Sequence, residues 1–188
     1  MYTSIIKAKE DNRLISLYTD LNNMENFHIV YVLNVKDGQV LEMNVGLHGE
    51  FDGYMVEFLD DIYRIEQESI YQKRIEKLSS QPGKFVKPFE ILYQNNPMID
   101  LLNAAMKNNI ISNINIGYEE NILGYITGIE DEKVFISQIT EEGEFDGRTV
   151  IYVKNIKKVI IGDVDTQDID VLVKLNEKQE RTQWDVLN

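Results

Sequence analysis

The sequence predicts a mainly β protein with a few helices, built as a tandem duplication of a five-stranded, strongly bent antiparallel barrel with a helical linker between the copies. The pentapeptide Gly-Glu-Phe-Asp-Gly occurs twice, at 49–53 and at 143–147. Around each occurrence, runs rich in Ile, Val, Tyr and Phe alternate with polar positions, which is typical of half-buried strands. Five such runs fall within residues 13–68, and strands so dense, with tight turns, favour a small barrel.

The repeat extends well beyond the pentapeptide. When residues 31–70 are placed over 125–164 without a gap, 10 of the 40 positions are identical, and apolar residues recur at several others. Preserved apolar spacing indicates that the same faces are buried in both copies. Two copies are too few for a solenoid, so the sequence predicts paired units. We expect a first barrel unit with its C-terminal helix at 1–80, a linker at 81–97, and a second barrel unit with a C-terminal helix and polar tail at 98–188.

The elements are expected in the same order in each copy. Strands are predicted at about 13–19, 27–37, 39–47, 53–60 and 62–68, and then at 110–117, 121–130, 133–140, 147–154 and 156–162. Helices are predicted at 4–11, 69–80, 98–107 and 166–178, while 89–95 is either a helical turn or a loop. Asp37-Gly38 predicts a type I′ hairpin turn, because Gly tolerates positive φ. Asp131-Glu132 needs a less favoured conformation there, so the two turns are expected to differ.

The strand spacing resembles that of SH3-like and Sm-like barrels, including the small C-terminal domain of a bacterial ribosome maturation factor. It also resembles a group of uncharacterised bacterial, Firmicute-type proteins. The segments that carry the resemblance are Gly124-Tyr125-Ile126, Asp52-Gly53-Tyr54, Ile62-Tyr63-Arg64-Ile65 and Ile156-Lys157-Lys158-Val159. RNA-binding Sm proteins have an Asn after the second-strand turn and an Arg-Gly pair near the end of the fourth strand. This chain has Val40-Leu41 and Val134-Phe135 at the first place and no Arg-Gly pair, so the resemblance implies a fold and assigns no RNA site.

Composition limits the classes of function. The formal charge is −13, from 32 acidic and 19 basic residues, and such a chain is repelled by nucleic acid and by anionic membranes unless its basic residues gather on one face. No run approaches the ~20 apolar residues of a membrane span, and the N-terminus lacks the apolar core of a signal peptide. The chain has no cysteine, which excludes thiolate nucleophiles and cysteine metal sites. We expect a soluble cytoplasmic protein without a membrane partner.

The pentapeptides are the first candidate site. In the functional hypothesis, the carboxylates of both pentapeptides contact a partner. These carboxylates belong to Glu50, Asp52, Glu144 and Asp146. The structural alternative, which the residue types favour, is a turn in which Asp bonds the backbone, Gly takes a special φ/ψ and Phe fills the barrel. The ligand spacing of a dedicated calcium loop is absent, so no metal is predicted.

A basic cluster in the second copy is the other candidate. A phosphate-contacting face is the functional interpretation, and it consists of Arg148, Lys154, Lys157 and Lys158, near Tyr152. A solvated barrel face is the favoured alternative, since the first copy does not repeat these lysines. His28 and His48 have no histidine counterparts in the second copy and are expected on the surface or at an edge strand.

The sequence contains no Gly-rich phosphate loop, Gly-x-Ser-x-Gly or His-Glu-x-x-His motif. It therefore predicts no enzyme activity and no cofactor. The preferred hypothesis is a non-catalytic cytoplasmic binding or adaptor protein acting through protein–protein contacts. The alternative is an RNA-binding or ribosome-associated factor that uses the small basic face. A homo-oligomer built through barrel edges or linker helices is compatible with either hypothesis.

Overall fold

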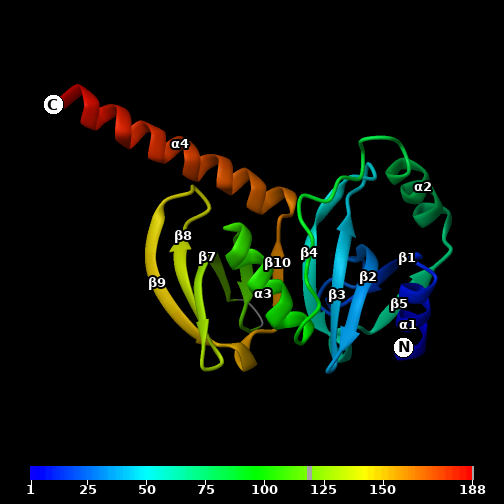
Figure 1. Ribbon diagram of the computed structural model, residues 1–188. Coiled ribbons are helices and arrows are strands. Elements are labelled where there is room, and N and C mark those ends of the chain that lie inside the picture. Colours follow the sequence, from blue (N-terminus) through cyan, green and yellow to red (C-terminus); the bar gives the residue numbers. More distant parts are fainter. Residues whose placement is uncertain (118–119, 188) are drawn as a thin grey trace.

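The chain is mainly β, with 38% of its residues in strands and 30% in helices. The computed structural model describes residues 1–117 and 120–187, with side chains as far as residue 179. Within these ranges, ten strands form one antiparallel sheet that is not closed, and four α helices pack around it (Figure 1).

The two halves contain the same elements in the same order. The first half comprises α1 (Tyr2–Glu10), β1 (Leu14–Tyr18), β2 (His28–Lys36), β3 (Gln39–Val45), β4 (Phe51–Phe58), β5 (Arg64–Gln67) and α2 (Ile70–Ser79). The second half comprises α3 (Pro97–Asn108), β6 (Ile111–Asn115), β7 (Asn121–Glu130), β8 (Lys133–Ile139), β9 (Phe145–Tyr152), β10 (Lys158–Ile161) and α4 (Val164–Leu187). The strands lie close to their predicted ranges, 89–95 is a loop, and α4 continues well beyond its predicted end. The predicted unit boundaries at 80 and 98 stay predictions.

Pairing of β4 with β10 joins the halves. The strand order is β5-β1-β2-β3-β4-β10-β6-β7-β8-β9, so each half has the same internal order and Val56 of β4 lies opposite Val159 of β10. The sequence predicted two bent barrels, whereas the strands make one open sheet. The physical reason is that the free edge of β4 pairs with β10 of the other half. In a closed barrel, this edge would pair with β5 of its own half. We call this contact, with the helix α3 that packs beside it, the junction.

Local backbone features also recur with an offset of 94 residues. Register shifts occur between Val32 and Asn34 and between Ile126 and Gly128, at equivalent places in the β2–β3 and β7–β8 ladders. The hairpin turns match too, because Asp131 and Glu132 both have positive φ, as the first-half turn residues do. The expectation that the two turns differ was therefore wrong. The strand register imposes the turn, and Glu132 adopts a left-handed conformation that costs a non-glycine residue about 1–2 kcal/mol.

The helices α1 and α3 fill different places although each begins a half. Helix α1 packs on β2 and buries only Ile5 and Ala8. Helix α3 lies between the halves, in contact with β2, β3 and β4 on one side and with β7 and β10 on the other (Figure 1). Its buried residues accordingly cover more than one side of the helix, and they include Met98, Leu101, Leu102 and Ala105. The largest apolar core thus spans the junction.

The first glycine of each pentapeptide is where the last helix of that half docks. A Cβ atom on Gly49 would lie 2.4 Å from the Ser79 backbone nitrogen in α2, and one on Gly143 would lie 2.6 Å from that of Val173 in α4. Both glycines have positive φ. The repeated pentapeptide therefore retains this glycine for close approach of a helix backbone as well as for its conformation.

Alanine at these glycines is expected to destabilise the protein through two separable effects. Positive φ costs a non-glycine residue about 1–2 kcal/mol, and the clash with the helix backbone adds about 1–3 kcal/mol. Gly147→Ala is the matched control, since Gly147 also has positive φ but no described atom lies within 4 Å of its Cβ position. Urea unfolding should show larger losses for Gly49→Ala and Gly143→Ala than for the control. Equal losses in all three variants would contradict the docking role.

Candidate functional site

The two identical pentapeptides lie in different surroundings. The first lies at the junction, where Asp52 Oδ1 accepts a hydrogen bond from the Val164 N–H, the first of helix α4, at 3.1 Å. Burial raises the pKa of the Asp52 carboxyl, and this hydrogen bond partly opposes the rise. The Phe51 ring packs against Tyr54, and Glu50 Oε2 accepts from the His48 N–H at 3.0 Å. In the first copy, the pentapeptide therefore acts as a structural turn, with Asp52 bonded to the backbone and Phe51 packed against other side chains.

The second pentapeptide is on the surface at the far end of the sheet. Glu144 and Asp146 are exposed, and Phe145 is 66% exposed. The prediction that the pentapeptide Phe fills the fold was thus wrong for this copy. The reason is position in the sheet: β9 is the last strand, whereas its counterpart β4 is covered by β10 and α3.

Three of the four predicted basic residues lie on or just beyond β9. Arg148, Lys154 and Lys157 are exposed. The Nζ atoms of Lys133 and Lys154 lie 5.7 Å and 5.3 Å from the centre of the Tyr152 ring, within cation–π range. A shallow hollow of about 370 Å³ adjoins them, lined by Ile116, Val150, Ile151, Tyr152, Lys154, Asn155 and Lys157. The structure therefore brings together an aromatic ring and several cations.

Lys158 is not part of this exposed group. Its Nζ atom makes an ion pair at 2.9 Å with Glu57 Oε2, across the β10–β4 ladder. The Glu57 side chain is 1% exposed and that of Lys158 is 26% exposed. Burial raises the pKa of the Glu57 carboxyl, and the Lys158 ammonium only partly offsets this rise. Lys158 therefore holds the junction together and is not available to a phosphate group.

A second buried glutamate lies beside this ion pair. Glu42 on β3 is fully buried, and neither of its carboxyl oxygens has a hydrogen-bond partner among the described residues. Burial and the nearby Glu57 raise the pKa of Glu42 well above its ordinary value. His28 is half-buried at the start of β2, which is not an edge strand, and burial together with the charge of Lys158 lowers its pKa to about 4. Comparison of the two halves gives a reason to expect buried glutamates, because Ile136 and Ile151 occupy the positions equivalent to Glu42 and Glu57.

The larger hollows lie at the junction. One of about 910 Å³ is lined mostly by residues of the first half, among them His28, His48, Glu50 and Asp52, together with Val164 and Gln167 of α4. Another of about 710 Å³ lies between the 84–89 segment and α4. Among the described side chains, no group of three or more His, Asp or Glu is arranged to hold a metal ion. The walls of these hollows are partly polar and partly apolar.

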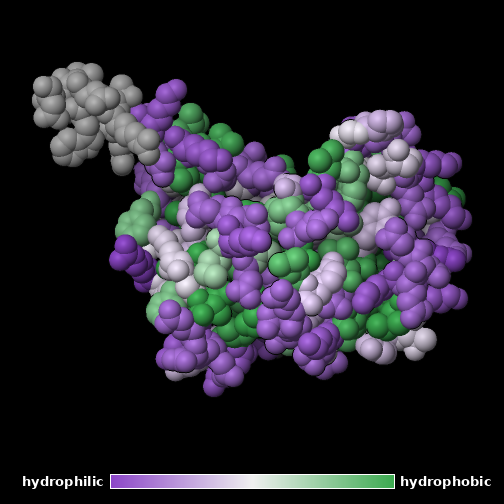
Figure 2. All heavy atoms as spheres, viewed as in Figure 1, coloured by the Kyte–Doolittle hydropathy of each residue, from purple (hydrophilic) through white to green (hydrophobic). Residues whose placement is uncertain are grey.

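The exposed side of β9 is the strongest candidate site. We define the β9 surface as Phe145, Asp146, Arg148, Val150 and Tyr152, all of them exposed. An edge strand offers backbone N–H and C=O groups for pairing with another strand. At the left of Figure 2, where β9 lies in Figure 1, apolar and hydrophilic residues both reach the surface. The second pentapeptide lies at the start of this strand, Arg148 lies on it, and Lys154 and Lys157 lie just beyond its end.

No protein-family model matches the chain, and no curated protein is detectably similar to it in sequence. In the part of the chain that the structure describes, no helix is long and apolar enough to cross a membrane. The structure itself therefore carries the functional inference.

Proposed function

We propose that the chain is a non-catalytic binding or adaptor protein that recognises a protein partner through the β9 surface. The observation that carries this proposal is the contrast between equivalent strands: β4 is covered by β10 and α3, whereas β9 exposes Phe145, Val150 and Tyr152 at the end of the sheet. A partner segment that adds a strand to β9 gains main-chain hydrogen bonds, and the exposed aromatic and apolar side chains select it.

The proposal also covers the type of fold in each half and the cellular compartment. The two halves are taken as tandem copies of an SH3-like or Sm-like unit, supported by the matching strand order, register shifts and turns. The acidic composition, with a formal charge of −13, favours a cytoplasmic protein partner over nucleic acid or an anionic membrane.

Affinity capture from native cytoplasm tests the proposal. Wild-type protein is expected to retain a partner protein after nuclease treatment, and Val150→Asp should lose it because a charge then lies on the pairing strand. The matched control is Val86→Asp, since Val86 is 64% exposed and Val150 is 51% exposed, but Val86 lies in the linker. Capture that is unaffected by Val150→Asp, or that disappears with nuclease, would contradict a protein partner at β9.

RNA binding is the second candidate, and one observation favours it. The Tyr152 ring lies within reach of Lys133 and Lys154, beside a hollow that Lys157 also lines. Aromatic stacking with flanking cations is how single-stranded nucleic acid is bound without sequence preference. This candidate predicts an RNA affinity that falls steeply with salt and with Lys154→Glu, measured by fluorescence anisotropy. The acidic residues Asp131 and Glu132 at the neighbouring turn oppose it.

A further inference from the structure

The junction shows how one half of this protein binds another. Beyond the β4–β10 ladder, it contains three close contacts around the first pentapeptide. Asp52 accepts from the Val164 N–H at 3.1 Å, and a Cβ atom on Gly53 would lie 2.7 Å from the Ile161 carbonyl oxygen. The Phe51 ring lies 3.9 Å from the Cβ position of Gly162, beside the hollow of about 710 Å³ that both halves line.

The two ends of the sheet carry the equivalents of these two surfaces. At one end, β9 presents Phe145, Asp146 and Gly147, each 94 positions after Phe51, Asp52 and Gly53. At the other end, β5 is followed by α2, whose first residue, Ile70, stands 94 positions before Val164 and is 90% exposed. One end of the sheet therefore has a strand equivalent to β4, and the other end has a strand equivalent to β10.

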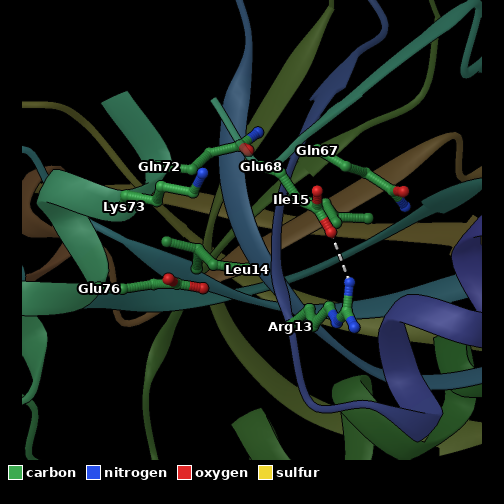
Figure 3. Close-up of a pocket in the computed structure, with 8 residues that line it drawn as sticks. All are labelled: Arg13, Leu14, Ile15, Gln67, Glu68, Gln72, Lys73 and Glu76. Carbon is green, nitrogen blue, oxygen red and sulfur yellow. Dashed lines mark hydrogen bonds and ion pairs between the residues drawn. The ribbon is translucent and has the colours of Figure 1, made fainter. Parts of the chain in front are cut away.

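The hollow beside the junction also has a counterpart at the β5 end. It has a volume of about 310 Å³ and lies between β1, the end of β5 and α2 (Figure 3). Its residues Glu68, Gln72, Lys73 and Glu76 stand 94 positions before Gly162, Thr166, Gln167 and Asp170 of the junction hollow. At the junction, Glu50 and Phe51 form the opposite wall of the hollow, and their equivalents Glu144 and Phe145 are exposed on the β9 side.

The space around the second pentapeptide fits such a contact. The Cβ position of Gly53 is crowded by the 161–163 segment, whereas no described atom lies within 4 Å of that of Gly147. The β5-side hollow is balanced in charge, because Arg13 and Lys73 line it together with Glu68 and Glu76, so the shape of the space and the register, and not charge, favour this contact.

We propose that the occupant of the β9 surface is a second copy of this chain, whose β5 extends the sheet head to tail in the register of the junction. This inference rests on the proposed function, because it names the partner of the β9 surface. The register places Val150 opposite Ile65 and Thr149 opposite Glu66 of the neighbour, as Val56 and Met55 lie opposite Val159 and Ile160. Asp146 then accepts a hydrogen bond from the first N–H of the neighbour's α2.

The association between chains is weaker than the junction within a chain. In the junction, α3 adds a buried apolar layer, but the equivalent helix α1 exposes Thr3, Ser4 and Lys7. The contact uses different surfaces on the two chains, so an assembly of any length keeps one free β9 surface at one end and one free β5 edge at the other. Such heterologous contacts give a ring when the rotation closes and an open filament when it does not.

Molecular mass tests this inference first. Light scattering from low micromolar to near-millimolar concentration should show species that are multiples of 21.9 kDa. Val150→Asp should raise the dissociation constant about tenfold or more, and Val86→Asp should leave it unchanged. Monomers at every concentration would overturn the inference.

Disulfide trapping tests the register independently, because the chain has no cysteine. A mixture of Thr149→Cys and Glu66→Cys chains should give a disulfide-linked dimer under mild oxidation, since directly opposite residues have Cβ atoms about 4.5–5.5 Å apart. Thr149→Cys mixed with Gln67→Cys should give much less, because neighbouring residues point to opposite faces. Dimers formed by Thr149→Cys alone would indicate β9 pairing with β9 and would overturn the head-to-tail arrangement.

The outcomes separate this inference from the proposed function. If the protein is monomeric and no mixed disulfide forms, while Val150→Asp still abolishes capture of a different protein, the β9 surface binds another partner and self-association is wrong. If that capture also fails, the proposed function falls with it.

Discussion

Replacing Lys158 with methionine is expected to lower the free energy of unfolding by about 3–5 kcal/mol, the usual effect of removing one partner of a buried ion pair. Lys158 is the ion-pair partner of Glu57, at 2.9 Å, and Glu57 is almost completely buried. Without the ammonium, the effect of burial that raises the pKa of Glu57 is opposed much less, and the carboxyl must stay protonated or carry an uncompensated charge. Because the pair crosses the β4–β10 ladder, the loss weakens the contact between the halves.

The neighbouring lysine provides the control for this experiment. Lys157→Met changes an exposed residue on the same segment and should change the free energy of unfolding by less than about 0.5 kcal/mol. A double variant with Glu57→Ile and Lys158→Met should recover most of the loss, since apolar replacement of a whole buried pair is often neutral or stabilising. The second half already has Ile151 at the position equivalent to Glu57. Urea unfolding of the four proteins measures the coupling, and equal losses for the two single variants would contradict it.

Local structure was predictable because its causes lie in short stretches of sequence. The strands follow from alternating apolar residues, and the N-cap Ser69 with Gln72 marks the start of α2 as a capping box. The junction was not predictable in this way. Residues of β4 and β10 are about a hundred positions apart, and any strand edge offers the same backbone groups, so nothing local selects β10 over β5 as the neighbour of β4.

The surroundings of the candidate site residues were also not predictable from the local sequence. The two pentapeptides are identical, yet Phe51 packs in the junction and Phe145 is exposed, because only their place in the sheet differs. The sequence groups Lys158 with the other basic residues of the second copy, but Lys158 pairs with Glu57, which is remote in sequence. Comparison of the copies gave only a partial signal: Glu42 and Glu57 stand at positions equivalent to isoleucines and are buried, but Glu66, which is equivalent to Ile160, has a side chain that is 35% exposed.

Glu42 should make the protein less stable as the pH rises. Burial and the nearby Glu57 raise the pKa of Glu42 in the folded state, while Lys158 lowers it by less. The unfolded chain loses this proton near pH 4.3, its ordinary pKa. Between that value and the raised folded pKa, the folded protein binds more protons than the unfolded chain, so its stability falls with increasing pH.

His28 has the opposite effect on stability. Its folded pKa of about 4 is below its ordinary value, so the stability that it contributes is lost as the pH falls from about 6.5 toward 4.

Glu42→Gln isolates the first effect, because glutamine has nearly the same shape and does not titrate. Between the ordinary pKa of glutamate and the raised folded pKa, wild type is expected to lose stability as the pH rises, and the variant should lose less, because Glu57, whose pKa burial also raises, remains. The variant should keep the acid-side loss that His28 causes. Glu141→Gln, at an exposed position, is the control and should follow the wild-type profile. Urea unfolding at a series of pH values measures all three proteins. Parallel wild-type and Glu42→Gln profiles would contradict a raised pKa of Glu42 in the folded state, and Glu42 would then have no part in the pH response.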